Sequence, residues 1–194
     1  MKPARPSYHY GQPYADLPEG WLTAEEIELL SALAKDKLVL EIGSWLGRST
    51  VVMARVASHV VAVDHHHGSA EHGPAVFTLQ HFLDNLESRG VRERVSICVM
   101  DSVHLDLFHS DSFDLVFIDG GHDFGTASRD LNHAFRLVRT EGVIAVHDYR
   151  PSVTSKGGVV SSSWPQVVAA VNDLAPRSGW RIEQLVGDLA VLRK

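Results

Sequence analysis

The sequence predicts an α/β protein built on a doubly wound, mostly parallel seven-stranded sheet with helices on both faces. Short runs rich in valine and isoleucine alternate with helical segments, and such runs without polar alternation are typical of strands buried on both faces. Helices between consecutive strands suit right-handed crossovers. The last two segments, 180–186 and 189–194, are joined by Gly187 and Asp188, which predicts an antiparallel hairpin at the C-terminal edge.

The same patterns place the elements in order. A first helix is expected over 23–37, where Thr23 is a candidate N-cap followed by glutamates in the first turn. Strands are then expected at 37–43, 59–64, 94–101, 113–120 and 142–148, before the hairpin. Further helices are expected at 48–58, 75–90, 126–139 and 164–175. Residues 150–163, RPSVTSKGGVVSSS, follow a strand end and are predicted to form a loop, of the kind that often covers a binding site.

Length and composition indicate how these elements are organised. A chain of 194 residues that is 44% hydrophobic suits one compact domain with a substantial core. The first twenty residues hold four prolines and three tyrosines without an apolar period. We therefore expect an extended N-terminal arm over 1–22 and a single domain over 23–194.

Charge and hydropathy exclude several classes of function. The formal net charge of −6 and a pI of about 6.0 give no basic footprint, so we expect neither nucleic acid nor an anionic membrane as partner. The apolar runs are far shorter than the roughly 18 residues of a spanning helix, and the N-terminal residues lack an apolar signal core. Cys98 is the only cysteine, so no intramolecular disulfide can form. A soluble, cytoplasmic protein is expected.

Acidic residues end five of the predicted parallel strands. These residues are Glu41, Asp64, Asp101, Asp119 and Asp148. Open α/β sheets bind ligands outside the carboxyl ends of their strands, near the point where the strand order reverses. The sequence therefore predicts a ligand site at this edge of the sheet.

The first strand end, with the pattern E-x-G-x-x-x-G, suits a ligand with a cationic group. Gly43 allows a tight turn and Gly47 allows close backbone approach, but the phosphate-binding pattern G-x-G-x-x-G is absent. Glu41 would repel a diphosphate. Asp64, about twenty residues on, is placed to accept both hydroxyls of a ribose, and Asp101 with Ser102 is placed near an adenine edge. An adenosine that carries an amino acid and a sulfonium fits this set better than NAD does.

Three segments carry a family resemblance. VLEIGSWLGRST, VVAVDHHHGSAEHG and DSFDLVFIDGGHDFGTASRDLNHAFRLVRTEGVIAVHDY together resemble the class I S-adenosylmethionine-dependent methyltransferases, which have a Rossmann-like fold. More narrowly, they resemble the small bacterial group related to macrocin-type O-methyltransferases and cephalosporin hydroxylase-like proteins. The resemblance covers residues 37–174.

The resemblance implies a role for each residue that matches the family pattern. The methionine part of the cofactor would be lined by Glu41, Gly43, Ser44 and Gly47. Asp64 would bind the ribose, and Asp101 with Ser102 would flank the adenine. The histidines at 65–67 are expected to form a solvated lid over the adenosine, and His65 and Asp119 complete the predicted cofactor-binding set. The competing structural interpretation is that Glu41 caps the following helix and that Asp64 and Asp119 are cap and turn residues.

The resemblance also implies a catalytic and metal centre. In metal-using relatives, the aspartate of a segment like Asp119-Gly-Gly-His122 and an acidic pair after the next strand bind Mg²⁺. This sequence has His147 and Asp148 at that pair. Because imidazole suits Zn²⁺ or Mn²⁺ better than Mg²⁺, three alternatives stay open for Asp119, His147 and Asp148: a different ion, Mg²⁺ bound with waters, or no metal. His122 is the candidate general base, and Asp119 the second catalytic residue.

The function implied is transfer of a methyl group from S-adenosylmethionine to a hydroxyl of a small molecule, such as a sugar or a secondary metabolite. The reaction is an in-line displacement, which needs acceptor and methyl group held close and aligned. The alternative is a protein that binds the cofactor on this scaffold without methyl transfer or for a different reaction. A homodimer joined through the N-terminal arm is compatible with the sequence.

Overall fold

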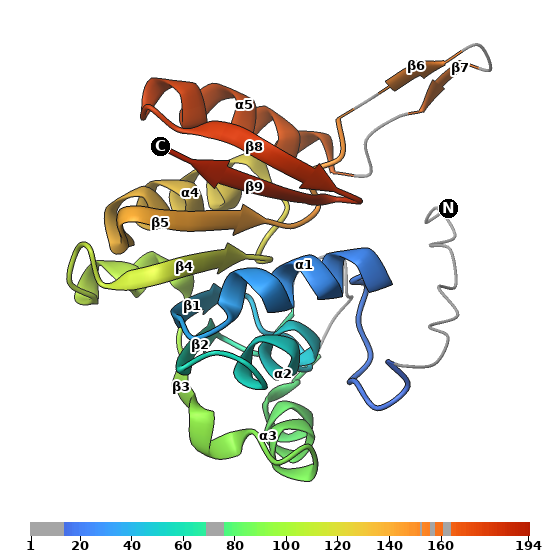
Figure 1. The fold of residues 1–194 in the computed structure, drawn as a ribbon, viewed down its shortest axis with the longest axis vertical. Helices are drawn as coiled ribbons and strands as arrows, with labels where there is room; N and C mark the ends of the chain where they lie inside the picture. Colours follow the sequence, from blue (N-terminus) through green and yellow to red (C-terminus); the bar gives the residue numbers. More distant parts are fainter. Residues whose placement is uncertain (1–13, 69–75, 152, 156–157, 161–163) are drawn as a thin grey trace.

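The computed structural model describes residues 14–68, 76–151, 153–155, 158–160 and 164–194. Its centre is a seven-stranded sheet with the strand order β3-β2-β1-β4-β5-β9-β8 (Figure 1). The strands are β1 (Leu38–Ile42), β2 (His59–Asp64), β3 (Val95–Val99), β4 (Phe113–Ile118), β5 (Val138–Val146), β8 (Arg181–Val186) and β9 (Leu189–Arg193). The first five are parallel, and β9 runs antiparallel to both β5 and β8. The predicted fold class is confirmed.

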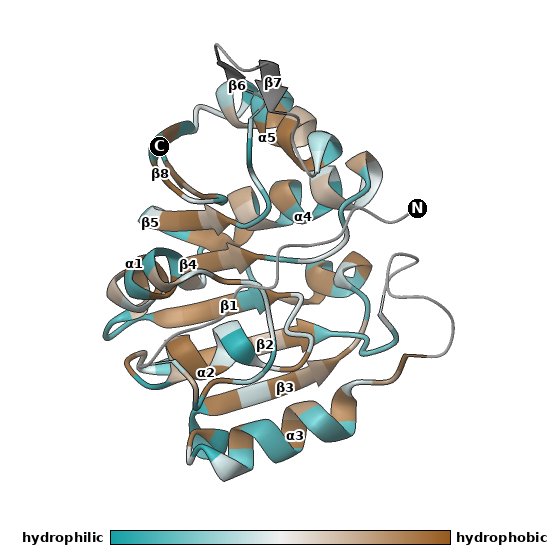
Figure 2. Ribbon diagram, turned by 90° about the vertical axis from the view of Figure 1, so that its right-hand side faces the viewer, coloured by the Kyte–Doolittle hydropathy of each residue, from teal (hydrophilic) through white to brown (hydrophobic). Residues whose placement is uncertain are grey.

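Helices cover both faces of this sheet (Figure 2). The helices are α1 (Ala24–Ala34), α2 (Arg48–Ala54), α3 (Leu79–Ser88), α4 (Phe124–Leu137) and α5 (Pro165–Arg177). Apolar residues of α1, α2 and α3 pack on one face in a core that includes Val39 and Phe117. Those of α4 and α5 pack on the other face, around Leu40 and Ile144. The central strands β1 and β4 therefore bury both of their faces, as their apolar sequences require, whereas the edge strand β8 is largely exposed.

Strand order creates the switch point of the sheet between β1 and β4. β1 pairs with β2 on one side and with β4 on the other. From β1 the chain proceeds outward to β2 and β3, then returns to β4 and proceeds outward the other way. Ligands bind at this point in open α/β sheets because the loops from the two halves diverge there.

Several boundaries differ from those predicted. Helix α3 begins at Leu79 rather than at residue 75, and α4 ends at Leu137, where β5 follows at once. Within the segment predicted as a loop, 153–155 and 158–160 form two short antiparallel strands, β6 and β7. No helix in the described ranges is long and apolar enough to cross a bilayer.

The last part of the predicted N-terminal arm packs on the domain. Leu17 and Leu22 are buried in the core on the α1 side of the sheet. The buried guanidinium of Arg48 donates a 2.8 Å hydrogen bond to the carbonyl of Pro18. Residues 14–22 therefore belong structurally to the domain, while residues 1–13 lie outside the described part of the chain.

Candidate active site

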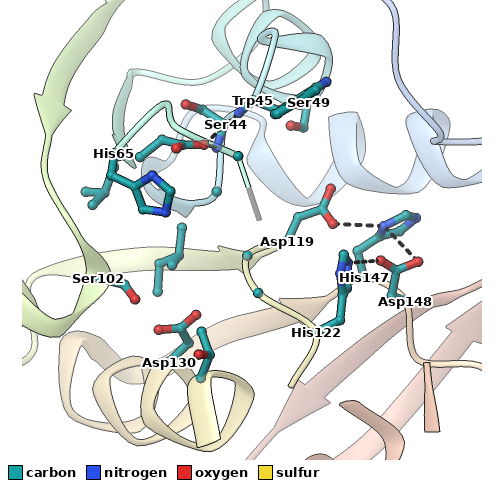
Figure 3. A pocket seen from close by; sticks show the side chains of 18 of the residues that line it. Ser44, Trp45, Ser49, His65, Ser102, Asp119, His122, Asp130, His147 and Asp148 are labelled. Atoms are coloured by element: carbon teal, nitrogen blue, oxygen red, sulfur yellow. Dashed lines mark hydrogen bonds and ion pairs between the residues drawn. The ribbon is translucent and has the colours of Figure 1, made fainter. Parts of the chain in front are cut away.

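A cavity of about 270 Å³ lies where the parallel strands end (Figure 3). Its walls come from the carboxyl ends of β1, β2, β4 and β5, from the 3-10 segment η3 (Ser102–Leu107), from α4 and from residues 19–22. The predicted residues that line it are Gly43, Ser44, Asp64, His65, Asp101, Ser102, Asp119, His122, His147 and Asp148. Two other predicted residues, Glu41 and Gly47, lie outside this lining.

The turn after β1 is built around Gly43. Its φ of 89° is unfavourable for a side chain, and a Cβ there would lie 2.3 Å from the backbone oxygen of Asp119. Glycine therefore lets the β1 turn lie directly against the end of β4. The next residue, Ser44, is 2% exposed, and its hydroxyl has no hydrogen-bond partner among the described residues. That hydroxyl is available to a ligand in the cavity.

Glu41 lies elsewhere than predicted. Its side chain is fully buried, and the hydroxyls of Ser49 and Thr50 in α2 donate 2.5 Å hydrogen bonds to its two oxygens. Burial raises the pKa of Glu41 to about 8, against the effect of those two hydroxyls. The group is therefore mostly protonated at neutral pH and is directed into α2. The side chain contacts the following helix, as the competing interpretation expects, but through the hydroxyls of Ser49 and Thr50 rather than as a cap of the helix, whose N-cap is Gly47.

Gly47 also has a structural role. It is the N-cap of α2 with a φ of 90°, and a Cβ there would lie 3.0 Å from the Phe82 ring of α3. The glycine thus allows α2 and α3 to pack closely. The structure gives it no direct place in the cavity wall.

Asp64, at the end of β2, holds the β1 turn in place. One of its oxygens accepts hydrogen bonds from the backbone amides of Ser44 (2.9 Å) and Trp45 (2.8 Å), and the other accepts one from His66 (2.7 Å). The carboxylate also lines the cavity. Because each oxygen can accept more than one hydrogen bond, Asp64 can order the turn and still bind hydroxyls of a ligand.

The three consecutive histidines do not form a common lid. His65 lines the cavity, but His66 is 1% exposed, and its Nδ1 lies 2.9 Å from the Thr78 hydroxyl. Burial lowers the pKa of His66 and so favours the neutral ring. His67 is exposed. The solvated lid expected from this run therefore reduces, at the cavity, to His65.

The wall formed by η3 and α4 contains a residue that the sequence interpretation missed. Asp101 N-caps η3 by accepting a hydrogen bond from the Val103 amide (2.8 Å), and Ser102 follows it in the cavity wall. Beside them lies Asp130 of α4, which is 1% exposed. A sequence signal was present, because Asp130 falls on the apolar stripe of α4 with Ala127.

The opposite wall holds a histidine–carboxylate pair. Nε2 of His122 lies 2.7 Å from an oxygen of Asp148, and both side chains are partly buried. The His122 ring stacks on Trp164, with ring centroids 3.8 Å apart. Asp148 has a φ of 60°, a conformation that non-glycine residues adopt mostly where the surroundings enforce it. The structure thus fixes the orientation of His122 from two sides.

His147 lies beside that pair and contacts two further carboxylates. Its Nδ1 lies 3.1 Å from Asp119, and its Nε2 lies 3.7 Å from the buried Glu26 of α1. Burial acts to lower the pKa of His147, but the carboxylates of Asp119, Glu26 and Asp148 outweigh it and hold the pKa well above its usual value. The structure groups His122 with Asp119 and Asp148: one candidate ligand atom from each lies within 4.8 Å of the others.

Comparisons with known proteins agree with this geometry. A family model described as a methyltransferase domain matches residues 40–149, more than half of the chain. The chain belongs to this methyltransferase family. Its sheet is that of a class I S-adenosylmethionine-dependent methyltransferase, so the resemblance to that class is confirmed.

Solved structures show the same fold over almost the whole chain. The cofactor-bound Rv0187 protein of MTB is 27% identical, with a TM-score of 0.65, over 91% of this chain and 82% of that one. The O-methyltransferase TomG of Streptomyces achromogenes, involved in tomaymycin synthesis and solved with SAM, is 22% identical, with a TM-score of 0.63 and the same coverage. An O-methyltransferase of Bacillus cereus, solved with SAH, is 20% identical over 92% of this chain and 84% of that one, with a TM-score of 0.62.

Proposed function

We propose that this methyltransferase acts on a hydroxyl oxygen of a small molecule, with His122 as general base. The observation that carries the proposal is the His122–Asp148 pair in the cavity wall. When Nε2–H of His122 donates a hydrogen bond to Asp148, the neutral ring has an unprotonated Nδ1, which is the tautomer that a base needs. A hydroxyl must lose its proton as its oxygen attacks the methyl group, and a positioned base contributes typically 10²–10⁴-fold to such a step.

The remaining residues of this centre position the base. Stacking on Trp164 restricts rotation of the His122 ring, and the charge of Asp148 stabilises the imidazolium that forms when the base takes a proton. Methyl transfer itself needs alignment rather than a covalent intermediate. The rigid turn at Gly43 on one wall and His122 on the other would hold cofactor and acceptor in line.

A divalent cation fits the same centre. Asp119, His122 and Asp148 offer two carboxylate oxygens and one imidazole nitrogen, a donor set that suits Mn²⁺ or Zn²⁺ better than Mg²⁺. When bound, the ion would supply a Lewis acid that lowers the pKa of the acceptor hydroxyl. His122 would then act as a ligand, so base catalysis and metal assistance are alternative modes of one centre.

A chelation experiment separates the two modes. The protein is treated with EDTA and dialysed, and methyl transfer from labelled S-adenosylmethionine to a panel of phenols, sugars and hydroxy acids is measured with and without Mg²⁺, Mn²⁺ or Zn²⁺. Base catalysis predicts full activity without metal. Metal assistance predicts loss of activity and its recovery with Mn²⁺ or Zn²⁺. Bound cofactor without methylation of any hydroxyl compound under these conditions would contradict the proposed O-methyl transfer.

A further inference from the structure

Asp130 is a buried acid whose carboxylate oxygens receive no well-formed hydrogen bond from the described residues. Its side chain is 1% exposed, and neither carboxylate oxygen has a hydrogen-bond partner among the described residues. Leaving a carboxylate buried and unpaired is costly, so native proteins normally pair such groups or place them where a ligand completes them. Asp130 lines the cavity, which leaves the second explanation.

The surroundings of Asp130 offer no structural role. The guanidinium of its neighbour Arg129 lies 3.9 Å from the Asp101 carboxylate, and its charge also acts to lower the pKa of Asp130. The α4 helix is capped by Asp123, not by Asp130. On the other side, Oδ2 of Asp130 would lie 3.0 Å from a Cβ built on Gly120, so the carboxylate reaches the backbone of the β4–α4 turn without bonding to it.

Asp130 lies on the cofactor side of the cavity. Figure 3 shows Asp130 next to Ser102 on one side, whereas His122 and Asp148 occupy the other. The resemblance places the adenine beside Asp101 and Ser102, at the end of β3. Burial raises the pKa of Asp130 to about 6. The Ser102 hydroxyl is close enough to act against this rise, although its geometry falls short of a well-formed hydrogen bond. The group is therefore mostly ionised above pH 7. An ionised carboxylate only accepts hydrogen bonds.

We propose that the Asp130 carboxylate accepts a hydrogen bond from the exocyclic amino group of the cofactor's adenine and so selects adenine over purines with a carbonyl at that position. On its pairing edge adenine offers one donor, the 6-amino group, next to the acceptor nitrogen N1. The carboxylate of Asp130 complements the donor, and the hydroxyl of Ser102 can donate to the acceptor. The inference rests on S-adenosylmethionine as cofactor and is independent of the methyl acceptor and of the base.

Replacing the amino group by a carbonyl tests this contact. S-inosylhomocysteine differs from S-adenosylhomocysteine at the purine, where a carbonyl oxygen replaces the 6-amino group and N1 carries a hydrogen. The carbonyl would face the Asp130 carboxylate, so two acceptors would be buried against each other. Sites built to bond a donor reject analogues that lack it much more strongly than apolar pockets reject a change of size.

The experiment is calorimetric titration of both ligands at pH 7.5 into the wild type, Asp130→Asn and a control, Asp106→Asn. Asp106 is an exposed acid of η3 outside the cavity lining, and its change alters the net charge equally. We expect the wild type and Asp106→Asn to prefer the adenine ligand by on the order of 100-fold. In Asp130→Asn the amide can donate to the carbonyl, so the preference should narrow to about tenfold or less.

Two results would overturn the inference. One is a wild-type preference below about threefold, which is less than a hydrogen bond to an ionised carboxylate would give. The other is an Asp130→Asn variant that folds, binds and keeps the wild-type preference, since Asp130 would then be structural. Should Asp130→Asn fail to fold, Asp130→Ser provides a smaller side chain that both donates and accepts, and it too should narrow the preference.

The same titrations distinguish failure of this inference from failure of the cofactor assignment and of the proposed O-methyl transfer. Wild-type binding of S-adenosylhomocysteine without discrimination between the purines overturns the role of Asp130 alone. Absence of binding to either ligand overturns the cofactor assignment together with the inference. Loss of O-methyl transfer in the acceptor panel, with purine discrimination intact, overturns only the proposed function.

Discussion

The β1 strand and the α4 helix each bury one carboxyl group, and the protein surrounds the two groups in opposite ways. Glu41 in β1 receives hydrogen bonds from two hydroxyls of α2, whereas Asp130 in α4 receives no well-formed hydrogen bond from the residues that the structure describes. Burial raises the pKa of both, to about 8 and about 6. A buried acid with its own donors holds two elements together. A buried acid without donors lies in a cavity wall, where a ligand can supply the missing partner.

The largest effect is expected for His122→Ala, which removes a side chain that faces the cavity. We expect turnover to fall by about 10²–10⁴-fold, because the variant removes the proposed base, while the affinity for S-adenosylhomocysteine stays at the wild-type value. The matched control is His104→Ala, an exposed histidine of η3 outside the cavity lining. Equal turnover of His122→Ala and the control would show that His122 is scaffold rather than catalyst.

Gly43→Ala tests a residue that holds two elements of the fold together, the β1 turn and the end of β4. The added Cβ would meet the backbone oxygen of Asp119 at 2.3 Å in a conformation that side chains rarely adopt. We expect the free energy of unfolding to fall by about 3 kcal/mol, with loss of cofactor binding as the turn moves. Gly90→Ala is the control, since it also has a positive φ but meets nothing within 4 Å. Urea denaturation of both variants measures the difference; equal losses would attribute the effect to the backbone angle alone.

Glu41→Gln tests whether the buried acid of β1 is neutral. Because the folded state raises the Glu41 pKa from 4.5 to about 8, folding takes up a proton between these values. The stability from this group is fully present below pH 4.5 and is lost as pH rises through 8. The Gln variant cannot titrate at this position and lacks this loss. Between pH 5 and pH 8.5 its free energy of unfolding should therefore rise by about 2 kcal/mol relative to that of the wild type. This figure is smaller than the full pKa shift implies because the structure relaxes around a charged Glu41. Parallel pH profiles of unfolding free energy for the two proteins would contradict a raised pKa.

Asp64→Asn tests a residue that both holds the β1 turn in place and lines the cavity. An asparagine has one oxygen instead of two, so it cannot accept all three backbone amides that Asp64 accepts. We expect about tenfold weaker binding of S-adenosylhomocysteine and a loss of about 1 kcal/mol of stability. Calorimetry and thermal unfolding, run together, check the two effects. Weaker binding with unchanged stability would assign Asp64 to the ligand alone.

The sheet could be predicted from the sequence because apolar periodicity depends on residues close together in the chain. Every predicted strand of the main sheet is present, and the C-terminal hairpin forms the antiparallel edge. The strand ends then place most of the predicted acids around one cavity. Boundaries were less predictable where two elements adjoin without a turn, as at Leu137 and Val138.

Side-chain partners could not be predicted in the same way, because they depend on residues distant in sequence. His147 and Asp148 are adjacent in sequence, yet the His147 side chain contacts Glu26 of α1 while the Asp148 side chain contacts His122. Nothing near residue 147 indicates an acid of the first helix. His66 likewise pairs with Thr78, across a segment of the chain outside the described residues.

Residues 19–22 bear on where the N-terminal boundary of the domain should be drawn. They form part of the cavity wall, although the family match starts at residue 40 and the first regular helix at Ala24. Leu22 is buried in the core, and Pro18 accepts the hydrogen bond of Arg48. A boundary drawn where the family match starts would cut into β1, which begins at Leu38, and would remove residues 19–22 from the cavity wall. The segment that matches the family is therefore shorter than the segment that forms the cavity wall.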